Sequence, residues 1–216
     1  MKQFFVIDQL CINEYGVLMC RKPFGRSYHK VHFKQGDLDS ASGAYSLAMV
    51  FNILGIFGYG DLSRNAVEHD KKEDEWKLIQ LLNNPDLYPN GLNPCDLIKM
   101  VEQDFSKYVT IDHTGKKASI PLKVKESIDN NIPVILQISF DQYETQWVVA
   151  VGYAINEEGQ MVYLLTLDSR KYTSKYSFWN GMLDLDKRTT HKYGFQYLTD
   201  AEEWASLDDA VIIKKK

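Results

Sequence analysis

The sequence predicts an α+β domain in which a helical first half, with a buried central helix, packs on a C-terminal antiparallel sheet. The first observation is an apolar helical pattern that begins at residue 44. The second is a switch to extended apolar runs from Val134 onward. The third is length, because 216 residues bury one substantial core. We therefore expect a single domain over residues 1–216.

Residues 1–34 are expected to form an N-terminal extension that packs on this core. They hold two short extended stretches separated by turn residues. The buried central helix follows, and Gly55 stands at the position of its C-cap. Its apolar residues keep the i, i+3, i+4, i+7 spacing of one helix face: Leu47, Val50, Phe51 and Leu54.

Three more helical segments are predicted before the sheet. They cover residues 62–84, residues 93–105 and residues 121–133, the last of which ends at an asparagine pair and Pro133. Asn93 is the expected N-cap of the second of these helices, with Pro94 in its first turn. The strands are expected in the extended segments that follow: 134–140, 146–155, 161–168, 179–186 and 191–199.

Charge and cysteine content exclude several classes of protein. With 29 acidic and 25 basic residues the formal net charge is −4, and no basic face for nucleic acid is expected. Cys11, Cys20 and Cys95 form no C-x-x-C pair, which argues against a metal site and a disulfide framework and favours a reducing compartment. No cofactor is expected. The N-terminus resembles neither a membrane span nor a signal peptide, so we expect a cytoplasmic protein or one delivered into a target cell's cytoplasm.

Four segments carry a resemblance to a known family. Gln35 precedes "DSASGAYSLAM" at the entrance of the central helix, and "ETQWVVAVGY" and "LLTLDS" follow in the predicted sheet. In this order the segments resemble the papain-like cysteine peptidases. The chain looks most like the leader peptidases attached to bacteriocin transporters and their soluble relatives. The likeness spans roughly residues 35–185.

The resemblance implies roles for four residues. Gln35 matches the glutamine that stabilises the oxyanion, and Asp168 matches the acid that orients the catalytic histidine. Ser42 stands where the family has its nucleophilic cysteine, and Gln146 stands where it has the histidine. A serine hydroxyl needs a base, and a glutamine side chain has no usable pKa. We therefore expect no cysteine-peptidase activity, and His32 is the one other histidine close enough in sequence to Gln35 to be considered.

Two functions remain open. In one, the chain is a bacterial toxin-type enzyme that acts on a nucleotide-like small molecule such as NAD, as an NAD glycohydrolase or ADP-ribosyl cyclase. Papain-like domains without the cysteine occur among such toxins, and the chain resembles them in outline. The N-glycosidic bond of NAD suits such a site because nicotinamide leaves as a neutral molecule and a carboxylate stabilises the ribosyl cation. In the other, the chain is a catalytically inactive peptidase-like domain that binds a peptide, an immunity protein or another protein partner.

The residues expected around the cleft fall into two groups. Candidates for catalysis are Asp39, Ser42, Glu144, Gln146 and Asp168. Candidates for substrate binding are Gln35, Ser40, Tyr45, Gln142 and Trp147. Segment 171–181, which is rich in aromatic residues and lysines, is either a plain surface loop or a loop that closes over an anionic ligand.

Overall fold

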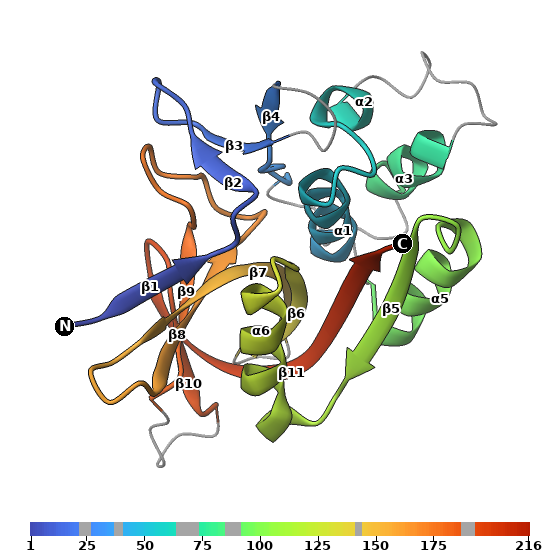
Figure 1. Ribbon diagram of the computed structural model, residues 1–216. Helices are drawn as coiled ribbons and strands as arrows, with labels where there is room; N and C mark the ends of the chain where they lie inside the picture. Colours follow the sequence, from blue (N-terminus) through green and yellow to red (C-terminus); the bar gives the residue numbers. More distant parts are fainter. Residues whose placement is uncertain (22–26, 37–40, 64–73, 85–91, 141–143, 187–192) are drawn as a thin grey trace.

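The computed structural model describes residues 1–21, 27–36, 41–63, 74–84, 92–140, 144–186 and 193–216. Its largest feature is an antiparallel sheet that closes on itself (Figure 1). Six strands form this barrel, and the last of them, β8, pairs back with the first, β7. In barrel order they are β7 (Thr145–Ile155), β6 (Val134–Phe140), β11 (Glu202–Lys215), β10 (Phe195–Leu198), β9 (Gly181–Asp184) and β8 (Met161–Leu167).

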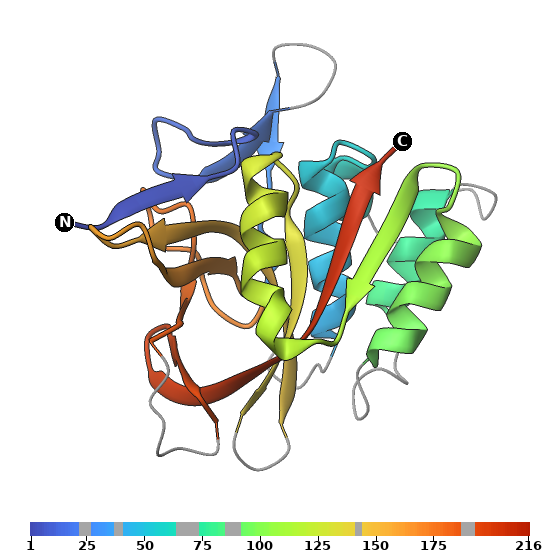
Figure 2. The ribbon, with the colours of Figure 1, turned by 60° about the horizontal axis from the view of Figure 1, so that its bottom comes forward.

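Two further strands pair with strands of the barrel. Strand β1 (Gln3–Val6) pairs antiparallel with β7, and β5 (Val109–Thr114) pairs antiparallel with the C-terminal half of β11. Figure 2 shows β11 leaving the barrel to run beside β5 toward the C-terminus. A separate three-stranded sheet consists of β2 (Leu10–Ile12), β3 (Leu18–Arg21) and β4 (Tyr28–Lys30).

Strand β7 is the centre of the core. Every residue from Gln146 to Ala154 is buried, as expected for a strand that is covered on both faces. Gly152 lets β1 approach closely, because a Cβ atom at this position would lie 2.3 Å from the carbonyl oxygen of Phe5. A glycine is therefore required where the N-terminal strand β1 pairs with β7.

Helix α1 (Ser42–Ile53) packs against β7 and β6. All of its residues except Tyr45 are buried, so its interior position comes from an almost wholly apolar or small-residue surface. Gly55, with a φ of 63°, follows the C-cap residue as the pattern predicted. The amide of Ile56 donates to the carbonyl of Phe51 at 2.8 Å, which closes the helix end in a Schellman motif.

The other described helices pack against the two sheets or against α1. They are α2 (Tyr59–Ser63), α3 (Asp74–Leu82), α5 (Pro94–Asp104), the short 3-10 helix η2 (Lys117–Ser119) and α6 (Ile120–Asp129). Asn93 caps α5, because its side-chain oxygen accepts a 2.9 Å hydrogen bond from the amide of Asp96. Helices α1 and α6 both pack on β6 and β7 (Figure 2).

The predicted fold class, a helical first half packed on a C-terminal antiparallel sheet, is wrong. The described part of the chain is mostly sheet, the sheet is a closed barrel, and four strands lie within the first 34 residues. Local periodicity located helices but carried no signal for closure, which depends on pairing between β7 and β8. The prediction also missed β11, whose Asp208 and Asp209 interrupt the apolar pattern at a bulge in its pairing with β6.

Candidate functional site

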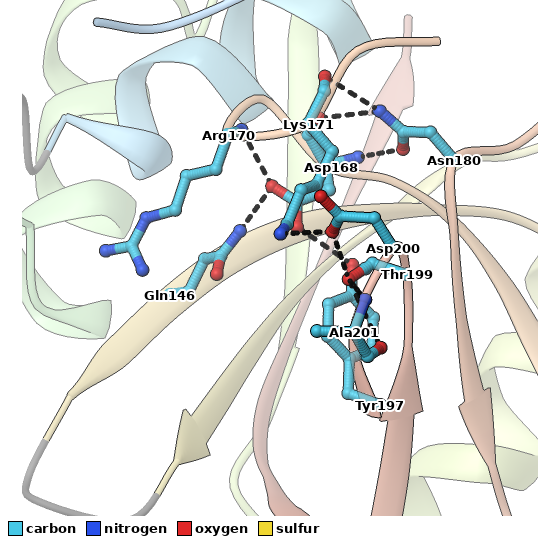
Figure 3. Close-up of polar contacts among 9 residues, drawn as sticks. All are labelled: Gln146, Asp168, Arg170, Lys171, Asn180, Tyr197, Thr199, Asp200 and Ala201. Atoms are coloured by element: carbon cyan, nitrogen blue, oxygen red, sulfur yellow. Dashed lines mark hydrogen bonds and ion pairs between the residues drawn. The ribbon is translucent and has the colours of Figure 1, made fainter. Parts of the chain in front are cut away.

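Ser42, Gln146 and Asp168 meet where α1 begins against the barrel. Ser42 is the first residue of α1, and its hydroxyl oxygen accepts a 3.1 Å hydrogen bond from the backbone amide of Trp147. Gln146, near the start of β7, donates from Nε2 to Oδ1 of Asp168, the residue that follows β8 (Figure 3). These three elements are distant in sequence. The barrel brings the side chains of Gln146 and Asp168 into contact, and the covering helix brings Ser42 to the backbone of the residue that follows Gln146.

Gln35 joins this group through the neighbour of Asp168. The amide of Gln35 donates to the carbonyl of Ser169 at 2.9 Å, and the Ser169 hydroxyl donates to Oε1 of Gln35. Both residues are buried. The two bonds hold Gln35 against the turn after β8.

The carboxylate of Asp168 is surrounded by donors. Besides Gln146, its Oδ1 accepts a 2.8 Å hydrogen bond from the amide of Arg170, and its Oδ2 accepts one of 3.2 Å from the hydroxyl of Tyr197. Burial raises the pKa of Asp168, and the donors from Arg170 and Tyr197 counteract part of that rise. Burial also raises the pKa of the Tyr197 hydroxyl well above its ordinary value, so Tyr197 remains a donor.

Asn180 holds the turn after β8 from its other side. Its Oδ1 accepts from the amide of Asp168 at 2.7 Å, and its Nδ2 donates to the carbonyls of Asp168 and Lys171 at 2.8 and 3.1 Å. Sequence reasoning did not select Asn180. The available signal was its place before Gly181, directly ahead of a strand, where an asparagine side chain often bonds to the backbone.

His32 does not supply the missing base. Its Nε2 donates to the backbone carbonyl of Asp168 at 2.8 Å, since a carbonyl oxygen can only accept. Burial lowers the pKa of His32, an effect that outweighs the opposing influence of this hydrogen bond. The ring is therefore bonded to the main chain of the turn.

The matched residues are closed to solvent in this structure. The exposed fractions of Ser42, Gln146 and Asp168 are 2%, 3% and 1%. Glu144, by contrast, lies at the surface with 52% of its side chain exposed, and it forms an ion pair with Arg170. Figure 3 shows Arg170 extending on the Gln146 side of the turn. The accessible charges at this junction are thus those of Glu144 and Arg170.

The remaining predicted residues have other surroundings or lie outside the described residues. Trp147 is buried, and its Nε1 donates to the carbonyl of Leu92 at 2.7 Å, so it packs in the core and does not wall an open cleft. Tyr45 is half-buried and packs against Ala41 and Ala44. Three predicted residues fall outside the described residues: Asp39, Ser40 and Gln142.

No thiol lies at this junction. Cys20 is buried beneath α1, where its Sγ contacts the carbonyl of Ile53 at 3.5 Å, and burial raises its pKa to about 12. Cys95 is exposed on α5, and Cys11 lies on β2. A reactive thiolate would need an electropositive setting that lowers its pKa, which is the opposite of the environment of Cys20.

Neither the scan of protein-family models nor the search of curated proteins finds a match to this chain. Among the described residues, no helix has the length and apolar character needed to cross a membrane. What the chain does must therefore be argued from its own side chains.

Proposed function

We propose that Ser42, Gln146 and Asp168 form a cysteine-peptidase-type site that has lost its nucleophile and base, in a protein that takes a nucleotide-like small molecule, with NAD as the leading candidate. The observation that carries this proposal is the bond from Gln146 to the buried carboxylate of Asp168. An imidazole in the place of Gln146 would receive the same orienting contact. The glutamine keeps the contact and lacks the proton chemistry.

Peptide hydrolysis by the cysteine-peptidase route has no support in this geometry. The Ser42 oxygen accepts a hydrogen bond from the main chain, and its contact on β7 is an amide N–H and not a base. A serine attacks only when a neighbouring group takes its proton, and neither Gln146 nor an N–H group can do so. Asp168 is directed at Gln146, Tyr197 and the turn after β8.

For a reaction on NAD, Glu144 is the carboxylate that fits best. It is exposed at the rim of the junction, whereas Asp168 is closed off and already bonded on both oxygens. In this proposal Arg170 leaves Glu144 to bind the pyrophosphate of the ligand, because guanidinium groups match phosphate geometry. The freed carboxylate then stabilises the ribosyl cation as neutral nicotinamide departs, and water or the adenine ring completes the exchange at the same carbon.

A second function, an inactive peptidase-like domain that binds a peptide or protein partner, is favoured by one observation. All four residues that match the peptidase pattern are buried and bonded within the protein. A substrate has no direct access to them in this conformation. In that case the junction serves the fold, and binding takes place elsewhere on the surface.

The test is to incubate the folded protein with NAD, to follow nicotinamide release by chromatography, and to measure NAD binding by calorimetry. We expect Glu144→Gln to lose nicotinamide release by about 100-fold or more, because the charge that stabilises the cation is gone. Glu102→Gln, a carboxylate change on helix α5, is the matched control and should leave release unchanged. If the wild-type protein neither binds NAD nor releases nicotinamide, the small-molecule proposal fails and the partner-binding function replaces it.

A further inference from the structure

A pocket of about 430 Å³ lies on the outer side of the turn that follows β8. Its lining includes both ends of the segment that Asn180 closes, together with the start of the turn before β11. Among the residues that line it are Lys34, Lys171, Tyr172, Asn180, Thr199 and Asp200. The volume lies within the range of small-molecule sites, which is roughly 300–1,000 Å³.

The lining is basic although the chain as a whole is acidic. Lys34, Arg170 and Lys171 line the pocket together with a single carboxylate among the described lining residues, Asp200. The guanidinium of Arg170 pairs with Glu144 in this structure and adds to the charge of the Lys34 and Lys171 ammonium groups once it leaves that carboxylate. A polar pocket with an excess of positive charge favours an anionic ligand.

Lys171 is held by an ion pair that a ligand can replace. It pairs with Asp200, whose side chain is 77% exposed, and the hydroxyl of Thr199 donates to the same Oδ1 at 3.0 Å. Exposed ion pairs contribute little net stability, so exchanging the carboxylate for a phosphate costs little. The phosphate would inherit both donors, the ammonium of Lys171 and the hydroxyl of Thr199.

The backbone of the pocket is preorganised while its aromatic side chain is open. Asn180 bonds to the carbonyl of Lys171, which fixes the start of the loop against the buried Asp168. Tyr172, next in the chain, is 81% exposed, and the ammonium of Lys34 lies 5.1 Å from its ring centroid. An exposed ring beside the ammonium of Lys34 offers a stacking face for a planar group attached to phosphates.

We propose that this pocket binds the phosphate groups of a nucleotide-like ligand, with Lys171 exchanging Asp200 for phosphate and Tyr172 stacking on the base. This proposal rests on the proposed function and names the phosphate subsite for it. It also makes an asymmetric prediction for the two members of one ion pair. The lysine is a ligand-binding group, and the aspartate competes with the ligand.

The experiment is calorimetric titration with inorganic pyrophosphate, ADP and adenosine at low salt. We expect Lys171→Gln to weaken pyrophosphate and ADP binding by about 10-fold, because one charge-assisted hydrogen bond is lost. Asp200→Asn should tighten binding of both by a few-fold, because the competing carboxylate is removed. Tyr172→Ala should weaken ADP and leave pyrophosphate unchanged.

Another exposed ion pair provides the control. Lys123 and Asp112 form a 3.2 Å pair that lines a different pocket, and Lys123→Gln and Asp112→Asn should change no affinity. Weaker binding in both Lys171→Gln and Asp200→Asn, equal effects of the control variants, or no binding of pyrophosphate and ADP would overturn the proposal. Pyrophosphate binding with the expected response in a protein that neither binds nor cleaves NAD supports the pocket and overturns the proposed function alone.

Discussion

The turn after β8 separates two regions of the molecule that differ in burial and in how their charged groups are bonded. On its inner side, Gln146 and Asp168 are buried, and each bond of the Asp168 carboxylate is made within the protein. On its outer side, the half-buried Lys171 pairs with the exposed Asp200 beside a pocket. The inner region resembles a catalytic site in its residues, but the outer region has the access and the exchangeable partners that binding requires.

The difference teaches that a sequence motif can predict which residues lie close together without predicting that they are catalytically active. A buried carboxylate with donors on both oxygens stabilises the structure around it, since breaking such a network is costly. An exposed pair contributes little to stability and is therefore available for exchange with a ligand. Stability and function should thus respond to different sets of substitutions, on the inner and the outer side of the same turn.

The largest expected effect is the loss of stability in Asp168→Ala. The substitution leaves the donors of Gln146, Arg170 and Tyr197 without their acceptor in a buried place. We expect the free energy of unfolding to fall by about 2–4 kcal/mol, measured by urea denaturation. Asp200→Ala, which removes an exposed carboxylate, is the comparison and should leave the free energy of unfolding nearly unchanged. Equal costs for the two variants would remove the distinction between the two regions.

A smaller loss is expected for Asn180→Ala. The asparagine side chain makes three hydrogen bonds to the backbone of the turn, and it is half-buried. We expect unfolding to become easier by about 1–3 kcal/mol, and hydrogen exchange at the amide of Asp168 to become faster. An unchanged exchange rate at that amide would show that Asn180 does not hold the turn.

The pH dependence of the free energy of unfolding reports on the protonation of Asp168. Because burial raises its pKa in the folded protein, the carboxyl group stabilises the fold at low pH, and this contribution is lost as the pH rises through the folded pKa. Compared with Asp168→Asn, the wild-type protein should therefore gain relative stability as the pH is lowered from neutral toward the ordinary aspartate range. Unfolding free energies of both proteins across that range provide the measurement. A difference between them that stays constant with pH would contradict the assignment.

The smallest effect concerns the outer pair. Lys171→Gln should change the free energy of unfolding by no more than about 0.5 kcal/mol, because the pair is exposed and screened by salt. Thermal denaturation in low and high salt measures this directly. A loss as large as that of Asn180→Ala would mean that Lys171 has a structural task, and the pocket would lose its exchangeable partner.

The sequence predicted local features well where the physical cause is local. The cap at Asn93, the end of α1 at Gly55 and the burial of α1 follow from spacing and from the conformational preferences of single residues. Closure of the barrel cannot be predicted from such local preferences. It depends on the pairing of β7 with β8 and on a long last strand with a bulge at Asp208 and Asp209.

The candidate site divides in the same way. Motif order predicted that Ser42, Gln146 and Asp168 belong together, and the structure places them in one buried junction. It did not predict their burial, nor the contacts of Asn180 and Tyr197, because these depend on strands that become neighbours only in the closed barrel. Sequence order alone therefore could not select Asn180 and Tyr197, which contact Asp168 from positions later in the chain.

The central claim is that Gln146 occupies the place of a catalytic imidazole beside Ser42 and Asp168. The most direct test compares Ser42→Cys with the double variant Ser42→Cys/Gln146→His and follows the ultraviolet absorbance of the thiolate across a pH titration. In the single variant we expect the pKa of the new thiol to lie at or above its ordinary value, because the position is buried. We expect a pKa below neutrality in the double variant, because a histidine oriented by Asp168 stabilises the thiolate. The same thiol pKa in both variants, in proteins shown to be folded, would contradict the claim.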